Sequence, residues 1–344
     1  NHSYYILKQK MHILVLGTGG VGGWVAARLH KAGPTAATVS VCCRSDYDAV
    51  VEHGITVSSN DHPDEDYHFR PYKVLRQGGR LPTEKEDQTD DDDEYVPADV
   101  LLVALKVLPE SVNLPELIAP LVGPKTAIAL FQNGVEIEDP IAKAFPDNEL
   151  ISVIVMVGVS RPKPGHVKHL GGGQLILGTY PKGVGETTRA LTELLRDGAG
   201  INSSVSETIL TNRWTKVMWN GSFNPLSVLA GGASTGELLA DPVSEENIRQ
   251  VMLEVWSVAE AVGCGFDKNM VEGFIKRTRS QAHANYKTSM LLDFENHRPM
   301  EVEALLGNVV RAAQRSGVAV PRISAMYASL RILDRKNQER GNTA

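Results

Sequence analysis

The sequence lacks a long apolar run, has few cysteines and carries no excess of positive charge. Its longest apolar stretch, Leu150 to Ser160, is far shorter than the roughly 18 residues that a membrane-spanning helix needs. The formal net charge of −6 argues against a nucleic-acid-binding surface. The 344 residues are 42% hydrophobic and 22% charged, so we expect a soluble globular protein of about two domains.

The three cysteines provide no disulfide framework. Cys42 and Cys43 are adjacent in an apolar run, which is typical of small core residues rather than of a disulfide or a metal pair. Residues 1–10 precede Met11 and show neither the apolar segment nor the cleavage site of a secretory signal, so we interpret them as an extension or a tag. Reduced thiols without a signal favour a cytoplasmic location.

The negative charge is concentrated in one segment. Residues Glu84 to Glu94 contain eight acidic side chains and one lysine, which leaves the rest of the chain close to neutral. Because like charges repel one another, this block is predicted to be a solvated loop insert at about 78–96. An acidic docking patch is the alternative.

Strands and helices alternate in the first part of the chain, which predicts an α/β domain of the Rossmann type at residues 11–200. It opens with a strand at 12–16, a glycine-rich turn and a helix at 24–32 that ends at Gly33. Further strands are predicted at 38–43, 100–105, 126–130 and 152–157, and short helices at 109–121 and 136–145.

Residues 165–178 interrupt this alternation. Two short β-like runs flank a glycine triplet, which predicts a hairpin that turns at the glycines and closes the first domain. His166 and His169 lie in this hairpin without a third ligand nearby, so no metal site is predicted.

The residues from 206 to 344 predict an all-α second domain. A helix begins at Asp241-Pro242, and its apolar residues repeat at helical spacing until Gly263 ends it. Further helices are predicted at 299–316 and 322–333.

The glycine-rich turn matches the dinucleotide-binding pattern G-x-G-x-x-G and lies between a strand and a helix, as that pattern requires. The first glycine permits the tight turn, the second lets the backbone approach a pyrophosphate, and the third lets the helix pack closely on the strand. The helix N-terminus then faces the phosphates. A tight turn without a ligand is the alternative. The predicted cofactor-binding residues here are Gly17, Thr18, Gly19, Gly20, Val21 and Gly22.

The end of the second strand bears on which nucleotide would bind. NAD sites usually place an acidic residue here to hold the ribose hydroxyls, whereas this chain has Arg44. A guanidinium binds a 2′-phosphate that a carboxylate would repel, so NADPH is favoured over NADH. Asp46, two residues further on, keeps NADH open as an alternative.

The stretch 213–225 places polar side chains on one face of a helix. At 100° per residue, Asn220 and Asn224 lie about 40° and about 80° around the helix from Lys216. A lysine can protonate the alkoxide that forms when hydride reaches a ketone, and asparagines can hold the oxygens of a small acid. Pro225 is expected to weaken the helix at Asn224 and to open this polar surface. A solvated helix face is the alternative.

Six short motifs follow one another along the chain. They are GTGGVG at 17–22, LK at 105–106, QNG at 132–134, WTKVMWNGSFNP at 214–225, SMLLD at 289–293, and the glutamate of RPMEVEALLG at 301. In this order and spacing they resemble the ketopantoate (2-dehydropantoate) reductases from Met11 to about Leu333. The resemblance implies a Rossmann-type domain followed by an all-α domain like the C-terminal domain of 6-phosphogluconate dehydrogenase.

The resemblance also implies a reaction, which is the NADPH-dependent reduction of 2-dehydropantoate to pantoate in pantothenate (vitamin B5) and coenzyme A biosynthesis. Lys216 would be the general acid, and Glu301 would reach across an interdomain cleft to cofactor and substrate. Lys106 and Asn133 would line the cofactor, and Arg44 would bind its 2′-phosphate. The substrate would be bound by Asn220, Asn224 and Ser289.

Taken without the resemblance, several of these residues have simpler interpretations. Lys106 at a strand end fits an ordinary surface lysine, and Asn133 before a glycine is also a turn signal. Glu301 is favoured at a helix start by the helix dipole alone. Ser289 fits a helix cap.

One departure from the family pattern concerns the substrate. Thr235 stands where the family often has an asparagine, and it is shorter, so its predicted role in substrate binding leaves open which 2-oxo acid is reduced. Opine-type or hydroxyacid dehydrogenation and a catalytically silent NADP(H)-sensing protein are the alternatives. The predicted partner is a small 2-oxo acid, with no nucleic acid and no membrane. The helical domain could support a homodimer.

Overall fold

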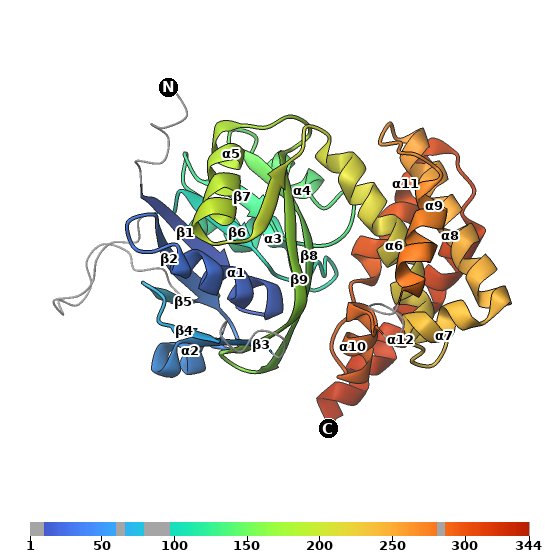
Figure 1. Ribbon diagram of the computed structural model, residues 1–344, viewed down its shortest axis with the longest axis horizontal. Coiled ribbons are helices and arrows are strands. Elements are labelled where there is room, and N and C mark those ends of the chain that lie inside the picture. The colour runs from blue at the N-terminus through green and yellow to red at the C-terminus, as the bar shows by residue number, and fades with distance from the viewer. Residues whose placement is uncertain (1–9, 60–65, 79–96, 281–285, 344) are drawn as a thin grey trace. The chain divides into compact units, whose positions relative to one another are not determined.

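The computed structural model describes residues 10–59, 66–78, 97–280 and 286–343, which form two compact units (Figure 1). The first unit contains the residues up to Leu105, Asn113–Gln132 and Glu138–Ile209. The second contains Lys106–Val112, Asn133–Ile137 and the chain from Leu210 onward. The acidic block at 84–94, for which a solvated loop is predicted, lies outside the described residues.

The first unit is built on a ten-stranded sheet in which β10 pairs with β9 beside the main path β4-β3-β9-β8-β7-β6-β1-β2-β5. The strands are β1 (Met11–Leu16), β2 (Ala37–Cys43), β3 (Ile55–Ser59), β4 (Tyr67–Phe69), β5 (Val74–Arg76), β6 (Val100–Val103), β7 (Ala127–Leu130), β8 (Leu150–Lys163), β9 (His166–Thr179) and β10 (Asn202–Val205). The helices of this unit are α1 (Gly20–Lys31), α2 (Tyr47–His53), α3 (Leu114–Ile118), α4 (Asp139–Ala144) and α5 (Glu186–Glu193).

The order of the parallel strands reverses at β1. This strand pairs in parallel with β2 on one side and with β6 on the other, so successive crossovers lead away from it in opposite directions. Its residues from Ile13 to Leu16 are almost fully buried, as expected for a strand with both faces covered. Open α/β sheets bind ligands outside the carboxyl ends of the strands at such a reversal, which here is the end of β1.

Helix α1 begins at Gly20, four residues before the predicted start at Trp24. The prediction treated the second half of the glycine-rich segment as loop, but these glycines are the first turn of the helix. A Cβ atom on Gly22 would lie 1.8 Å from the carbonyl oxygen of Gly17, and one on Gly23 would lie 2.6 Å from a methyl carbon of Val167. The missing side chains therefore let the helix lie directly on the turn and on the sheet.

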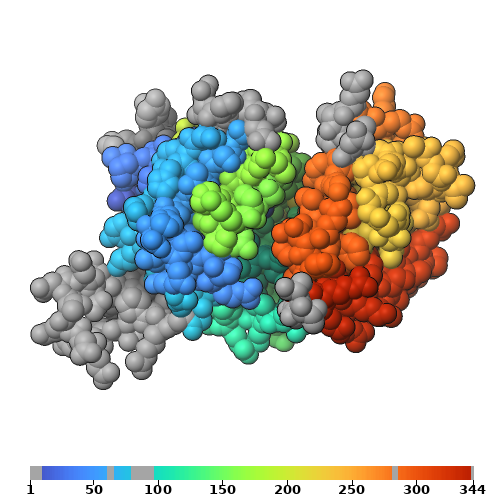
Figure 2. Space-filling view, turned by 90° about the horizontal axis from the view of Figure 1, so that it is seen from below, coloured from blue at the N-terminus to red at the C-terminus, as the bar shows by residue number. Residues whose placement is uncertain are grey.

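The prediction of a hairpin within residues 165–178 is wrong, because His166–Thr179 forms the single strand β9. Strands β8 and β9 pair antiparallel over 14 residues each, and the chain reverses at Pro164-Gly165. The glycines at 171–173 lie inside β9, where the pairing with β8 is irregular and all three φ angles are positive. The far end of this hairpin pairs with β3, and Figure 2 shows its green surface beside the blue surface of that region.

The second unit is helical. Its helices are α6 (Ile209–Leu229), α7 (Thr235–Ala240), α8 (Pro242–Ala261), α9 (Met270–Arg279), α10 (Ser289–Glu295), α11 (Asn308–Ser316) and α12 (Pro321–Thr343), with a π-helical turn at Glu303–Gly307 before α11. The predicted start of α8 is confirmed, because the Asp241 side chain accepts a hydrogen bond from the Ser244 N–H. Helix α12 runs ten residues beyond its predicted end at Leu333. Within the described part of the chain, none of the helices has the length and apolarity to cross a bilayer.

Replacement of Gly22 by alanine is expected to lower the free energy of unfolding by about 2 kcal/mol or more, because the new methyl group would overlap the Gly17 carbonyl. Gly19→Ala is the matched control, since nothing lies within 4 Å of its Cβ position and its φ of −64° suits alanine. Urea unfolding of both variants measures the difference. Equal stabilities would contradict this account of the glycine pattern.

Candidate functional site

The turn after β1 has the geometry of a pyrophosphate cradle. Gly17 has a φ of +93°, in the region that favours glycine, and the space around the Cβ position of Gly19 is open. Helix α1 begins there with no side-chain cap and no acidic residue in its first turn. Its first N–H groups can therefore donate to an anion, and the residues predicted from Gly17 to Gly22 fit a dinucleotide.

Arg44 follows the last residue of β2 and is exposed. The nearby Asp46 is only 2% exposed and points away from solvent. Its carboxylate accepts hydrogen bonds from the Thr18 hydroxyl at 3.4 Å and the Ser45 hydroxyl at 3.1 Å, and it forms an ion pair with Arg161 of β8. At the end of β2, the structure thus presents the guanidinium of Arg44 and pairs the carboxylate of Asp46 with protein groups.

In the second unit, three of the predicted residues form a hydrogen-bonded chain. The Nζ of Lys216 donates to the Oδ1 of Asn133 at 2.7 Å, and the Nδ2 of Asn133 donates to the Oε2 of Glu301 at 3.0 Å. The single amide of Asn133 therefore separates the amine from the carboxylate. The other carboxylate oxygen of Glu301 accepts from the Val107 N–H at 3.0 Å.

Asn133 is held in place by the loop that carries it. Gly134 has a φ of +107°, and a Cβ atom on it would lie 2.7 Å from the carbonyl oxygen of Ala304. The Gly134 carbonyl accepts a hydrogen bond at 3.0 Å from Arg213, which is almost fully buried. The Asn133-Gly134 pair is therefore a turn signal, as the alternative interpretation has it, and the turn aims the Asn133 amide at Lys216.

The ionisation of Lys216 is strongly perturbed. Burial, followed by the guanidinium of Arg213 three residues earlier on α6, lowers the pKa of Lys216 to about 7, although the carboxylate of Glu301 acts in the opposite direction. Burial also raises the pKa of Glu301, against the effect of its hydrogen bonds from Asn133 and Val107. An amine with a pKa near neutrality can both hold and release a proton under physiological conditions.

Lys106 lies beside the same carboxylate but has its own partners. Its Nζ is 2.7 Å from the carboxylate of Asp293 and donates to the Pro299 carbonyl at 3.0 Å. Asp293 also accepts from Arg298 at 3.0 Å. Lys106 is thus fixed by a partly buried ion pair, which an ordinary surface lysine would lack.

Asn220 and Asn224 lie on α6 at one and two turns from Lys216, as the helical spacing predicts. They are 9% and 1% exposed, and the Oδ1 of Asn224 is buried without a hydrogen-bond partner in the described part of the chain. Helix α6 continues through Pro225 to Leu229, so the proline does not end the helix, although it has no N–H to donate to the Gly221 carbonyl.

The last two predicted substrate-binding residues lie at the starts of two other helices of the second unit. Thr235 is fully buried at the start of α7, where its N–H donates to the Tyr286 carbonyl at 3.0 Å. Ser289 is exposed at the start of α10. The cap of α10 is Thr288, whose hydroxyl accepts from the Leu291 N–H, so the interpretation of Ser289 as the cap is wrong.

The sequence analysis misses three charged residues near the site. They are Arg213, Asp293 and Arg161. Arg213 precedes Lys216 by one helical turn, and this spacing was a usable signal. Asp293 lies in the SMLLD motif, but the motif alone does not indicate its ion pair with Lys106. Arg161 gave no sequence signal, because 115 residues separate it from Asp46.

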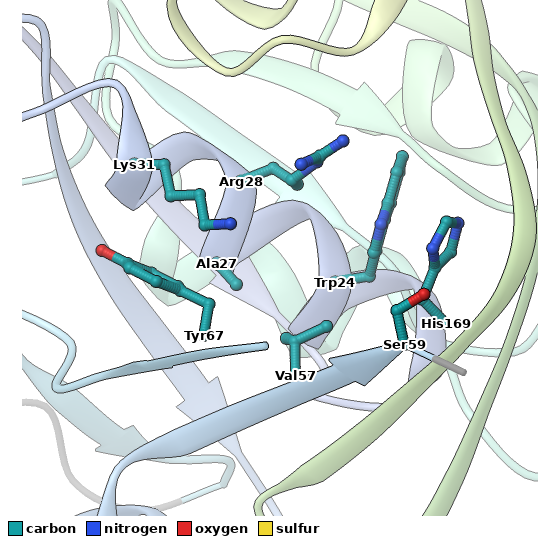
Figure 3. Close-up of a pocket in the computed structure, with 8 residues that line it drawn as sticks. All are labelled: Trp24, Ala27, Arg28, Lys31, Val57, Ser59, Tyr67 and His169. Atoms are coloured by element: carbon teal, nitrogen blue, oxygen red, sulfur yellow. The ribbon is translucent and has the colours of Figure 1, made fainter. Parts of the chain in front are cut away.

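A small pocket in the first unit contains none of the predicted site residues (Figure 3). It lies between α1 and the strands β3, β4 and β9. Trp24 stacks on His169 with ring centroids 5.9 Å apart, and the Lys31 amine lies 4.7 Å from the centre of the Tyr67 ring. These contacts assign His169 to the packing of α1 on the sheet.

Comparison with known proteins identifies the family. The ketopantoate reductase PanE/ApbA model matches residues 13–182, and the model of its C-terminal domain matches residues 208–334. The chain belongs to the ketopantoate reductase family. A 2-dehydropantoate 2-reductase from Nostoc sp. is 32% identical over 329 residues, which cover 94% of this chain and 95% of that relative. Both the resemblance and the fold class are thereby confirmed.

Solved structures agree with this assignment. A 2-dehydropantoate 2-reductase from Methylococcus capsulatus is 39% identical, has a TM-score of 0.82, and aligns over 95% of this ketopantoate reductase family member and 98% of its own chain. A complex of D-mandelate dehydrogenase with NADH and anilino(oxo)acetate is 21% identical with a TM-score of 0.78, over 96% of this chain and 100% of its own. At that identity it shows a shared fold alone.

We expect Glu301→Gln to lower the pKa of Lys216 further below its value of about 7, because the variant loses the negative charge that favours the ammonium. The chemical shift of lysines labelled at Cε, followed against pH, reports this titration. Glu303→Gln is the matched control, since the Glu303 carboxylate binds Arg311 and Tyr327 instead. An unchanged titration of Lys216 in Glu301→Gln would refute the proposed coupling.

Proposed function

We propose that this protein catalyses the NADPH-dependent reduction of 2-dehydropantoate to pantoate, the step that serves pantothenate and coenzyme A synthesis. Membership of the ketopantoate reductase family supports the reaction class. The observation that carries the proposal is the Lys216–Asn133–Glu301 chain, because it provides an amine of near-neutral pKa with a fixed orientation. Such a group is what the protonation of a carbonyl oxygen requires.

In this proposal the cofactor-binding residues are divided between two sets. The turn from Gly17 to Gly22 holds the pyrophosphate against the N-terminus of α1, and Arg44 binds the 2′-phosphate. Lys106 and Asn133 line the cofactor. NADPH, when bound, supplies the hydride that reduces the keto carbon. The open backbone at Gly19 and the exposed guanidinium of Arg44 support this assignment.

Lys216 acts as the general acid. Its Nζ gives one proton to the keto oxygen as that oxygen gains negative charge, so the ketone and the proton together with the hydride become a secondary alcohol. Asn133 keeps the amine directed by accepting one of its hydrogen bonds, and Glu301 holds the Asn133 amide in the required orientation. After the transfer the neutral amine takes a proton from water.

We propose that Asn220 and Asn224 bind the carboxylate and hydroxyl oxygens of the substrate. Neutral amides can do this without lowering the acidity of Lys216, which an additional anion would do. The buried Oδ1 of Asn224, for which the described residues supply no hydrogen-bond donor, is an acceptor that a substrate hydroxyl can satisfy. Ser289 and Thr235 complete the proposed substrate set.

A second candidate is the reduction of a different 2-oxo acid by the same residues. Thr235 in place of the asparagine favours it, because the shorter, fully buried threonine offers the substrate fewer hydrogen bonds. Oxidation of NADPH followed by absorbance, with 2-dehydropantoate, 2-oxoisovalerate and pyruvate in parallel, separates the two candidates. The highest kcat/KM on 2-dehydropantoate supports the first, and a higher value on another acid supports the second.

Lys216→Ala is expected to lower kcat by about 10²- to 10⁴-fold, the usual contribution of a general acid, and to leave the Kd for NADPH nearly unchanged. Steady-state kinetics and a fluorescence titration with NADPH measure the two quantities. Lys276→Ala removes an exposed lysine from α9 and serves as the control. Near-normal turnover of Lys216→Ala would reject the role given to the amine.

The pH dependence of kcat/KM follows from the pKa of about 7 for Lys216. A general acid works only in its protonated form, so kcat/KM should be high below this pKa and fall about tenfold for each further pH unit above it. A profile measured from about pH 6 to about pH 9 tests this. A flat profile over that range would show that Lys216 does not supply the proton in the rate-determining step.

A further inference from the structure

The carboxylate of Asp46 has an unusual position for a protein that is to bind a phosphorylated nucleotide. It follows Arg44 by two residues, so their Cα atoms lie no more than about 7 Å apart. Asp46 is nevertheless only 2% exposed, and its oxygens are engaged by Thr18, Ser45 and Arg161. The acid near the proposed 2′-phosphate site is thus turned inward and paired.

The three partners come from three different elements. Thr18 belongs to the glycine-rich turn, Ser45 follows β2, and Arg161 lies near the end of β8. The neighbouring residue Val159 contacts the same turn, since its side chain lies 3.0 Å from the Cβ position of Gly20. Arg161 is therefore held beside the turn by the strand that carries it, and its side chain is 33% exposed.

Without a counter-charge, Asp46 would favour the wrong nucleotide. A carboxylate near the end of the second strand accepts hydrogen bonds from the ribose hydroxyls of NADH and repels the 2′-phosphate of NADPH. The Arg161 guanidinium offsets this charge and binds Oδ1 of Asp46, the same oxygen that accepts from the Ser45 hydroxyl. Arg44 then acts on the phosphate without competition from a neighbouring anion.

We propose that Arg161 determines the preference for NADPH over NADH, as the counter-charge that neutralises Asp46 and keeps it turned inward. It is a positioning residue for the nucleotide site. This inference rests on the proposed use of NADPH, and it concerns a residue outside both the glycine turn and the end of β2.

The test is the ratio of the Kd for NADH to the Kd for NADPH, measured by fluorescence titration in the absence of any substrate. In Arg161→Gln this ratio should fall about tenfold or more, because loss of a charge-assisted pair exposes the site to the Asp46 carboxylate. Arg161→Lys keeps the positive charge and should therefore retain most of the preference for NADPH. An unchanged ratio in Arg161→Gln would overturn the proposal.

A double-mutant cycle separates neutralisation of Asp46 from direct contact with the phosphate. Asp46→Asn alone should keep the preference for NADPH. In the double variant Asp46→Asn/Arg161→Gln, the ratio of the two Kd values should return most of the way to that of the unmodified protein, since the negative charge of Asp46 is absent as well. If the double variant has a ratio as low as that of Arg161→Gln, Arg161 acts on the phosphate itself, and the assigned role is overturned.

Two controls make the outcome specific. Lys163→Gln removes an exposed positive charge from the same strand and should leave the ratio unchanged, and thermal unfolding checks that each variant is folded. If the unmodified protein binds neither nucleotide, or does not prefer NADPH, the proposed cofactor use fails. If it prefers NADPH and Arg44→Gln loses that preference while Arg161→Gln keeps it, only the inference about Arg161 fails.

Discussion

The amide of Asn133 is the interaction on which the candidate site depends. It accepts from Lys216 with its oxygen and donates to Glu301 with its nitrogen, so only one orientation of the amide serves both neighbours. A carboxylate bonded directly to the amine would stabilise the ammonium and raise its pKa. The neutral spacer satisfies the hydrogen bond while burial and Arg213 keep the proton labile.

Charge compensation is a theme common to both units. Asp46 is paired with Arg161 in the first, and Lys106 is paired with Asp293 in the second. Asp46 lies two residues from the predicted Arg44, and Lys106 is itself a predicted cofactor-binding residue; each is paired with a residue from a distant part of the chain. Buried charges are costly unless they are paired, so these partners decide which charges remain available to a ligand.

Much of the fold was predictable from local sequence, and much of the site was not. The strand before Gly17, the capped start of α8 and the shared face of Lys216, Asn220 and Asn224 all follow from short-range periodicity. A glycine triplet is typical of a turn, so the sequence predicts a hairpin there, whereas in the structure the three glycines form an irregular stretch within the single strand β9. The bond between Asn133 and Lys216 joins residues 83 positions apart, and no local pattern encodes it.

The absence of a side chain at Gly134 has a consequence for recognising functional relatives. The carbonyl of Ala304 occupies the space that a Cβ atom would need, and the φ of +107° disfavours any other residue there. A larger residue at this position would force the loop to shift, and we expect this shift to disturb the hydrogen bond between Asn133 and Lys216 while leaving the lysine itself in place. If Lys216 has the proposed role, the asparagine–glycine pair is therefore a better criterion for that role in relatives than the lysine alone.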